Sequence, residues 1–321
     1  MILFGKNGNV KEVRKTRKVK TIAKICLPAG VILSVVLIVI CQVPSGSGMM
    51  VVLNTSLPSV PNEMVALKTA SGGMTQEWAL DVANRVFDVS DNFKDLGNVW
   101  KICSGSREAW VYKSGGIEYL DTYKTFEKIY RQDELPSDIE CREIAELFLE
   151  NIGGEGLLQT NLDMEFRDVV RDKIVIAHAD GTIENCFTNA HVNYDLSFNG
   201  TKLYGPGAKL RVYIGSGGEI TGLMKYLPQI EELKTVRTLT PEEAIEVFRG
   251  GDYGASEATI QSFELVYYVP SPEAETTYII PVYNLSGTFT LLNGDVVGFG
   301  EIIPAVSQSE LENMGLPTEL G

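Results

Sequence analysis

Histidine is scarce in this sequence, and the odd number of cysteines outside the N-terminal apolar segment prevents complete disulfide pairing. Only His178 and His191 occur in 321 residues. A zinc site needs three or four converging ligands, so two histidines leave few ways to build one. Cysteines outside that segment occur at positions 103, 141 and 186. One disulfide is possible among Cys103, Cys141 and Cys186, with the third thiol free or intermolecular, and the pairing stays open.

The two histidines bound HADGTIENCFTNAH, a segment that also contains Asp180, Glu184 and Cys186. These side chains include the atoms of a zinc site, but their spacing matches no helical H-E-x-x-H motif. Apolar residues alternate after His191, which predicts a strand with His191 on the opposite, solvated face. We therefore expect no metal at these residues.

Other site motifs are incomplete. DVSDNF, which begins at Asp88, resembles the start of a calcium loop, but Phe93 stands where Gly is needed and Val99 where Glu is needed. The GSR and GSG tripeptides lack the flanks of a nucleophile elbow. We expect no catalytic, cofactor-binding or metal-binding residue, and hence no enzyme and no cofactor.

Glycines are frequent on both sides of Lys209 and Arg211, in GPGAKLRVYIGSGGEITGLM. Such a stretch invites comparison with phosphate loops, but Pro206 and Gly207 occupy the positions that G-x-x-x-x-G-K-[ST] gives to Lys and Ser/Thr. Alternating apolar residues predict a strand, and Gly217 with Gly218 supplies a tight reversal. The stretch is predicted to be a β-hairpin whose cations lie on the polar surface.

Positive charge is concentrated at one end of the chain. Residues 1–24 contain eight lysines and arginines and one acidic residue, a net of +7, whereas the whole chain carries −14. The remaining residues therefore carry −21. A nucleic-acid-binding protein needs a basic surface on its folded part, so we expect no nucleic-acid partner.

An apolar run, ICLPAGVILSVVLIVICQV, follows the basic head at residues 25–43. Nineteen residues of helix span roughly 28 Å, about the thickness of a bilayer's hydrocarbon layer. The preceding cations predict a cytoplasmic N-terminus and an extracytoplasmic body. The run is longer than a secretory signal core, which favours an uncleaved anchor, although small residues in PSGSG leave cleavage open. Ile40 before Cys41 argues against a lipoprotein.

The expected organisation is a basic cytoplasmic segment (1–24), a transmembrane helix (25–43), a linker (44–62), two α+β domains (63–152 and 155–306) and a tail (307–321). Helix starts are predicted at Thr75, at the Ser137–Glu140 capping box and at Thr240-Pro241. Turns at Ser114-Gly115-Gly116, Asp180-Gly181, Asn199-Gly200 and Asn293-Gly294 predict hairpins. The predicted fold class is α+β, with capped helices packed on antiparallel hairpin sheets.

A family resemblance lies in the C-terminal part. TPEEAIEVF, ATIQSFELVYYV, TTYIIPVYNLSGTFT and NGDVVGFGEIIPA resemble a PepSY-type module, in which one helix precedes a short antiparallel sheet. Residues of about 190–306 are similar to the ectodomains of membrane-anchored regulatory proteins of the YycI type. The resemblance implies an extracytoplasmic protein, tethered by one N-terminal helix, that binds partners or restrains enzymes.

The sequence therefore predicts a single-pass, membrane-anchored extracytoplasmic binding or regulatory module, in contact with the bilayer through residues 25–43. Its partner is expected to be a protein or peptide, bound by strand addition or charge. A structural protein of the cell envelope is the alternative, and an anchored or secreted hydrolase is a third. Asn54, Asn199 and Asn284 lie in N-glycosylation sequons, and whether they carry glycans stays open.

Overall fold

The computed structural model describes residues 49–315 except 70–73, 155, 159–160, 179 and 275–277. All of these lie in one compact unit, Pro44–Gly321. The predicted membrane helix at residues 25–43 and the basic head lie outside the described residues. Within the described part, no helix is both long enough and apolar enough to cross a membrane.

The described residues are built mainly of strands. The strands are β1 (Met50–Leu53), β2 (Glu63–Thr69), β3 (Asn92–Asp95), β4 (Val99–Ser104), β5 (Arg107–Tyr112), β6 (Ile117–Asp121), β7 (Asp163–Ala177), β8 (Ile183–Phe198), β9 (Thr201–Tyr204), β10 (Leu210–Ile214), β11 (Ile220–Lys225), β12 (Ile230–Arg237), β13 (Ala255–Tyr268), β14 (Tyr278–Ile279), β15 (Pro281–Leu291) and β16 (Val296–Pro304). The α-helices are α1 (Gln76–Phe87), α2 (Asp138–Gly154), α3 (Pro241–Arg249) and α4 (Gln308–Asn313), and a π-helical turn, η1, covers Tyr123–Glu127.

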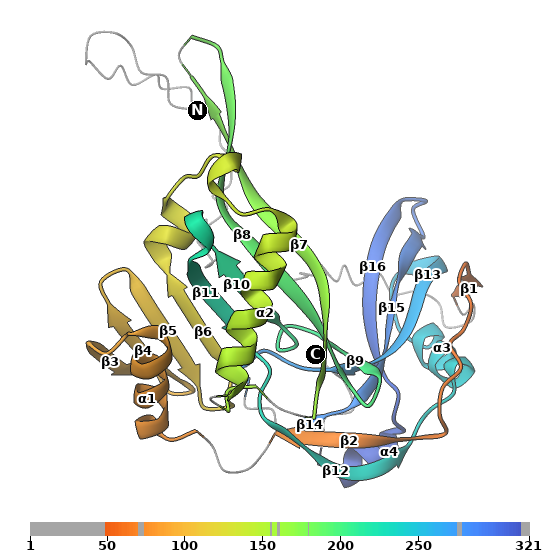
Figure 1. Cartoon of the computed structure of the whole chain (residues 1–321). Coiled ribbons are helices and arrows are strands. Elements are labelled where there is room, and N and C mark those ends of the chain that lie inside the picture. The colour runs from red at the N-terminus through yellow and green to blue at the C-terminus, as the bar shows by residue number, and fades with distance from the viewer. Residues whose placement is uncertain are drawn as a thin grey trace, which may run out of the picture. The chain divides into compact units, whose positions relative to one another are not determined.

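The sheet topology shows that the predicted fold class is wrong. Thirteen strands form one mixed sheet in the order β16-β15-β13-β9-β8-β10-β11-β6-β5-β4-β3, with β1 on β13 and β7 on β8 (Figure 1). β13 pairs in parallel with β1 and β9, so the sheet is not a set of antiparallel hairpins. Strands from both predicted domains share it, because β6 pairs with β11. β12, β2 and β14 make a second, three-stranded sheet.

The reason for the error is that turn and cap signals are local. All four predicted turns do close antiparallel pairs: β5–β6, β7–β8, β8–β9 and β15–β16. The pairings that join these hairpins into one sheet link residues far apart in the chain, such as Tyr267 of β13 with Leu203 of β9. Hairpin signals carry no information on such long-range pairings. The sequence therefore did not show that the hairpins join into one large mixed sheet.

The predicted helix starts are confirmed. The backbone N–H of Trp78 donates to Oγ1 of Thr75 at the start of α1 (3.1 Å). Before α2, Ser137 and Glu140 exchange hydrogen bonds as a capping box. Thr240 and Glu243 form a second box before α3. These bonds satisfy backbone donors that have no partner within the helix.

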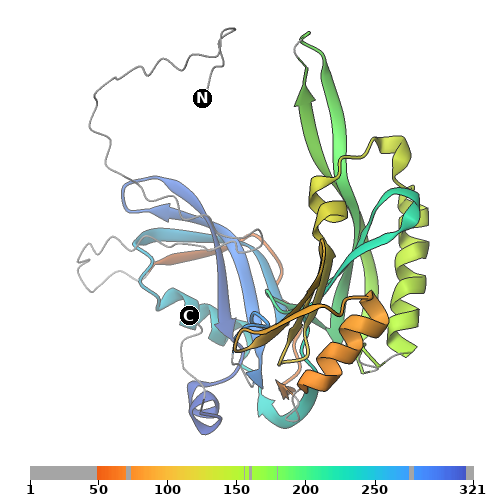
Figure 2. The same cartoon turned by 90° about the vertical axis from the view of Figure 1, so that its left-hand side faces the viewer.

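Helices α1 and α2 lie on the same side of the large sheet (Figure 2). In α1, Phe87 stacks on Tyr119 of β6 at 4.6 Å between ring centroids. In α2, buried residues including Leu149 join the apolar core formed by Val192 of β8 and Val212 of β10. The opposite face of β3–β8 receives neither helix.

A second core lies under α3. Phe248 of α3 packs with Phe289 of β15 and Phe299 of β16, whose rings are 4.3 Å apart. A third, smaller core joins α4, through Leu311, to β12 and β15. Both cores pack on the C-terminal strands β13 and β15.

The glycine-rich stretch forms the predicted hairpin. β10 and β11 pair antiparallel, and Gly217 and Gly218 have φ of 67° and 82°, in the region that favours glycine. Gly207 has a different role. A Cβ there would lie 2.0 Å from the backbone oxygen of Pro270, so only glycine allows the two backbone segments to approach this closely.

Candidate binding face

The sheet face away from α1 and α2 carries polar and aromatic side chains on eight neighbouring strands. Because side chains alternate along a strand, the strands turn most of their buried apolar residues to the helices and the residues between them to this face. The strand registers place one residue from each strand in a single line, from β3 to β7. We call this line the polar row: Lys94, Lys101, Trp110, Glu118, Met224, Arg211, Asn193 and Asp168.

At one end of the polar row, Lys101 and Trp110 are held by Glu108. The ammonium of Lys101 lies 2.8 Å from Oε2 of Glu108 and 4.3 Å from the centre of the Trp110 ring. The indole N–H of Trp110 donates to the same oxygen at 3.1 Å. Both side chains are thus fixed in place while remaining partly exposed.

In the middle of the row, Glu118 accepts a hydrogen bond of 2.6 Å from the hydroxyl of Tyr226. Burial raises the pKa of the Glu118 carboxyl, against the opposing effect of the Tyr226 hydrogen bond. Burial, with the nearby Glu118, also raises the pKa of Tyr226. Tyr112 meets the Tyr226 ring edge-on at 5.9 Å. The Glu118 carboxyl and the Tyr226 hydroxyl therefore hold each other in place, and both are partly removed from solvent.

Arg211 lies next in the row and is oriented by neutral groups. Its Nε donates to Oδ1 of Asn193 at 2.7 Å and its Nη1 to the hydroxyl of Tyr213 at 3.2 Å. The amide nitrogen of Asn193 in turn donates to Asp168 at 2.6 Å. Arg211 lies on the polar face of its strand, as expected, but it is half-buried and held by this network.

Lys209, two residues before Arg211, remains exposed, as predicted. Its ammonium lies 6.0 Å from the centre of the Tyr226 ring. Desolvation and the neighbouring guanidinium of Arg211 lower the pKa of Lys209. Two cations thus stand close together on this face.

His191 is buried, with 4% of its surface exposed, so the predicted solvated position is wrong. It lies opposite Tyr213 in the register, and its Nδ1 is 3.2 Å from Oδ1 of Asn189. The cover comes from η1: its Thr125 carbonyl accepts from Asn189 at 3.0 Å, and its Phe126 ring meets Tyr213 at 6.1 Å. Burial, and next the charge of Arg211, lowers the pKa of His191 to about 4.

The other residues considered from the sequence do not converge. His178 pairs with Glu184 at 3.1 Å, while Asp180 accepts from Thr182. Asp88 ends α1 and binds Arg107 at 2.7 Å. No group of three or more histidine, cysteine, aspartate or glutamate side chains in the described residues is arranged to hold a metal ion. The thiols of Cys103, Cys141 and Cys186 are all free.

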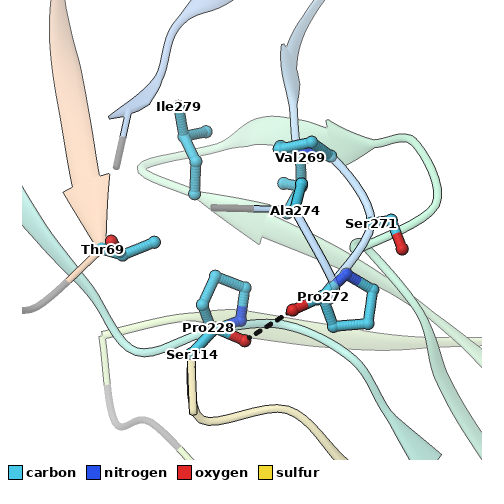
Figure 3. A pocket seen from close by; sticks show the side chains of 9 residues that line it. Thr69, Ser114, Pro228, Val269, Ser271, Pro272, Ala274 and Ile279 are labelled. Atoms are coloured by element: carbon cyan, nitrogen blue, oxygen red, sulfur yellow. Dashed lines mark hydrogen bonds between the residues drawn. The ribbon is translucent and has the colours of Figure 1, made fainter. Parts of the chain in front are cut away.

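A small pocket lies elsewhere, where β2 and β14 meet the segment after β13 (Figure 3). The hydroxyl of Ser114 donates to the carbonyl of Pro272 at 3.2 Å across it. Thr69 and Ser271 add two more hydroxyl groups, and the remaining walls are aliphatic or proline side chains such as Val269 and Ile279. It contains no titratable side chain, so it offers little chemistry for a site.

Sequence reasoning missed the polar row. The alternation of polar and apolar residues within β4, β5 and β10 is visible in the sequence. The registers that align these strands are not, since they join segments up to about a hundred residues apart, such as Glu118 with Met224. The alternation of polar and apolar residues within single strands was therefore the only feature of the sequence that could have pointed to the polar row.

Comparison with known proteins adds little to this geometry. No protein-family model and no curated protein matches the chain. Among solved structures, an uncharacterized protein from Eubacterium rectale is similar, with a TM-score of 0.47 and 13% identity over 79% of this chain and 87% of that chain. A likeness at this level carries no argument, so the PepSY and YycI resemblance stays a prediction.

Proposed function

We propose that the protein is a non-catalytic binding or regulatory module that takes a protein or peptide partner on the face of the polar row. The observation that carries this proposal is the alignment of eight side chains across eight strands, with Trp110 and Arg211 among them. Aromatic residues and arginine are enriched where proteins bind each other. A line of this kind suits an extended partner better than a small substrate.

Binding is favoured over catalysis by how the polar groups are engaged. Catalysis needs a nucleophile, base or acid converging on one reacting atom. Three charged groups of the row instead bond to lateral neighbours: Lys101 to Glu108, Glu118 to Tyr226 and Arg211 to Asn193. Such bonds hold rotamers in place, which lowers the entropy lost when a partner binds.

The proposed location is the cell membrane, with residues 25–43 in the bilayer and the body outside. The apolar run and the basic residues before it support this orientation. The resemblance to YycI-type ectodomains supports the same arrangement. Protease added to intact cells should remove the body and leave the N-terminal segment. A soluble mature form beginning near Met49 would contradict the anchor.

The binding face is tested with the full chain expressed in its own membrane. Chemical crosslinking and affinity capture should recover a stoichiometric partner with the natural chain and much less with Trp110→Ala. Leu147→Ala is the matched control, because Leu147 is 60% exposed on α2, on the helix-covered side of the sheet. Lys101→Gln provides a second variant of the face should Trp110→Ala prove unstable. Equal capture by all four chains would refute the proposal.

A further inference from the structure

We propose that Arg211 and Lys209 together form a binding site for a carboxylate group, supplied by the partner of the polar-row face. The inference rests on the proposed function for the source of that carboxylate. The site itself is argued from the charges and hydrogen bonds around the two cations.

Neither Lys209 nor Arg211 is paired with a carboxylate among the described residues. Most lysines and arginines of the described body lie within 4.0 Å of a carboxylate, as Lys101, Arg107 and Lys202 do. Lys209 and Arg211 have no such ion pair among the described residues. Lys94 of the same row also has no ion pair among the described residues, but Lys209 and Arg211 lie two residues apart on one face, and two such cations together attract an anion at short range.

The guanidinium of Arg211 is held in one orientation. Its Nε and Nη1 are committed to the neutral oxygens of Asn193 and Tyr213, which fixes the plane of the guanidinium. Nη2 has no hydrogen-bond partner among the described residues. A guanidinium held in this way presents its remaining donors to an incoming anion without loss of rotamer freedom. The ammonium of Lys209 lies on the same side of the strand, two residues away, and adds a second charge.

Glu118 is the carboxyl group whose charge acts on Lys209. Glu118 bonds to the hydroxyl of Tyr226 rather than to Lys209 or Arg211. That hydrogen bond occupies one oxygen of the carboxyl, and no ion pair joins Glu118 to either cation among the described residues. Lys209 and Arg211 therefore keep donors for a second carboxylate, which Glu118 opposes only through its own charge.

A carboxylate suits the site better than a phosphate. Phosphate sites recruit backbone N–H groups from glycine-rich loops. Here the loop before Lys209 is closed to such a role, because the N–H of Gly207 donates to the carbonyl of Val269 at 3.0 Å. The planar fork of one guanidinium beside one ammonium matches the two oxygens of a single carboxylate.

The test follows the Nε–H resonance of Arg211 in the full-length, isotope-labelled chain, assigned by its loss in Arg211→Lys. The probe is N-acetylalanine, which carries one carboxylate, and its neutral isostere is N-acetylalaninamide. We expect a saturable shift with the acid at millimolar concentration, none with the amide and a weaker one with inorganic phosphate. An equal response to the amide, or to phosphate, would overturn the assignment to a carboxylate.

Charge variants give effects of opposite sign. Lys209→Gln should weaken N-acetylalanine binding roughly tenfold, as expected for loss of one charge-assisted contact. Glu118→Gln should tighten it, because a nearby acid is removed while an oxygen remains for Tyr226. Lys202→Gln is the matched control, since Lys202 already pairs with Asp195 at 3.1 Å, and should change nothing. Unchanged affinity for N-acetylalanine in both Lys209→Gln and Glu118→Gln would refute the proposed carboxylate site.

The same variants separate the two proposals. If Lys209→Gln loses the probe but crosslinked partner capture is unchanged, the carboxylate site stands and the partner does not use it. If Trp110→Ala loses the partner while N-acetylalanine never binds, the face stands and the carboxylate site is wrong.

Discussion

Acid should destabilise this protein through His191 alone by a measurable amount. The imidazole is buried opposite Tyr213, and its charged form is disfavoured first by desolvation and then by Arg211. The carboxylates of Asp172 and Asp168 act in the opposite direction, as Asp172 lies 3.8 Å from Nδ1, and Arg167 adds to the effect of Arg211. The balance lowers the pKa of His191 to about 4.

The sign and size of the effect follow from proton linkage. In the unfolded chain the histidine takes up a proton at a pKa of 6.5, whereas in the folded chain His191 is protonated only near pH 4. Stability from the neutral imidazole is thus complete above pH 6.5, falls as the pH drops towards 4, and levels off below. One pKa unit corresponds to 1.36 kcal/mol, so the loss between pH 7.5 and 4.5 is about 2.5 kcal/mol.

Carboxylates elsewhere also titrate in this range, so the assay compares two chains. Urea unfolding of the natural protein and of His191→Gln at several pH values isolates the imidazole. Glutamine keeps a polar group beside Asn189 but takes up no proton. The difference in unfolding free energy should change by about 2.5 kcal/mol between pH 7.5 and 4.5. Parallel profiles, or an NMR titration midpoint of His191 near 6.5, would refute the reasoning.

Three further predictions concern the free energy of unfolding, for two glycines and one helix cap. Gly207→Ala should cost about 1–3 kcal/mol by overpacking, because the new Cβ would meet a backbone oxygen, whereas Gly300→Ala, with open space around it, should stay within about 0.5 kcal/mol. Gly218→Val places a branched residue at φ of 82° and should cost about 1–3 kcal/mol in thermal or urea unfolding. Thr240→Ala removes the cap of α3 and should cost about 1 kcal/mol; an unchanged melting temperature of Gly207→Ala, Gly218→Val or Thr240→Ala would contradict the role given to that residue.

Local features were predictable because neighbours in sequence decide them. The cap of α3 needs only Thr240 and Glu243, three residues apart, and the β10–β11 reversal needs only Gly217 and Gly218. The exclusion of a phosphate loop likewise rested on which residues stand at Pro206 and Gly207. In each case the interacting groups lie within a few residues, so composition and spacing contain the relevant physics.

By itself, the sequence determined the charge division between head and body, the apolar run at residues 25–43, the helix starts and the hairpin turns. Only the tertiary structure decided the mixed sheet, the polar row and the burial of His191. Alternation along β8 shows correctly that His191 faces away from Val192, but not what lies over that face. The cover comes from η1, more than sixty residues earlier, and the partners of Arg211 and Glu118 come from other strands. Strand register and face coverage depend on contacts between distant segments, and these form only when the whole chain folds.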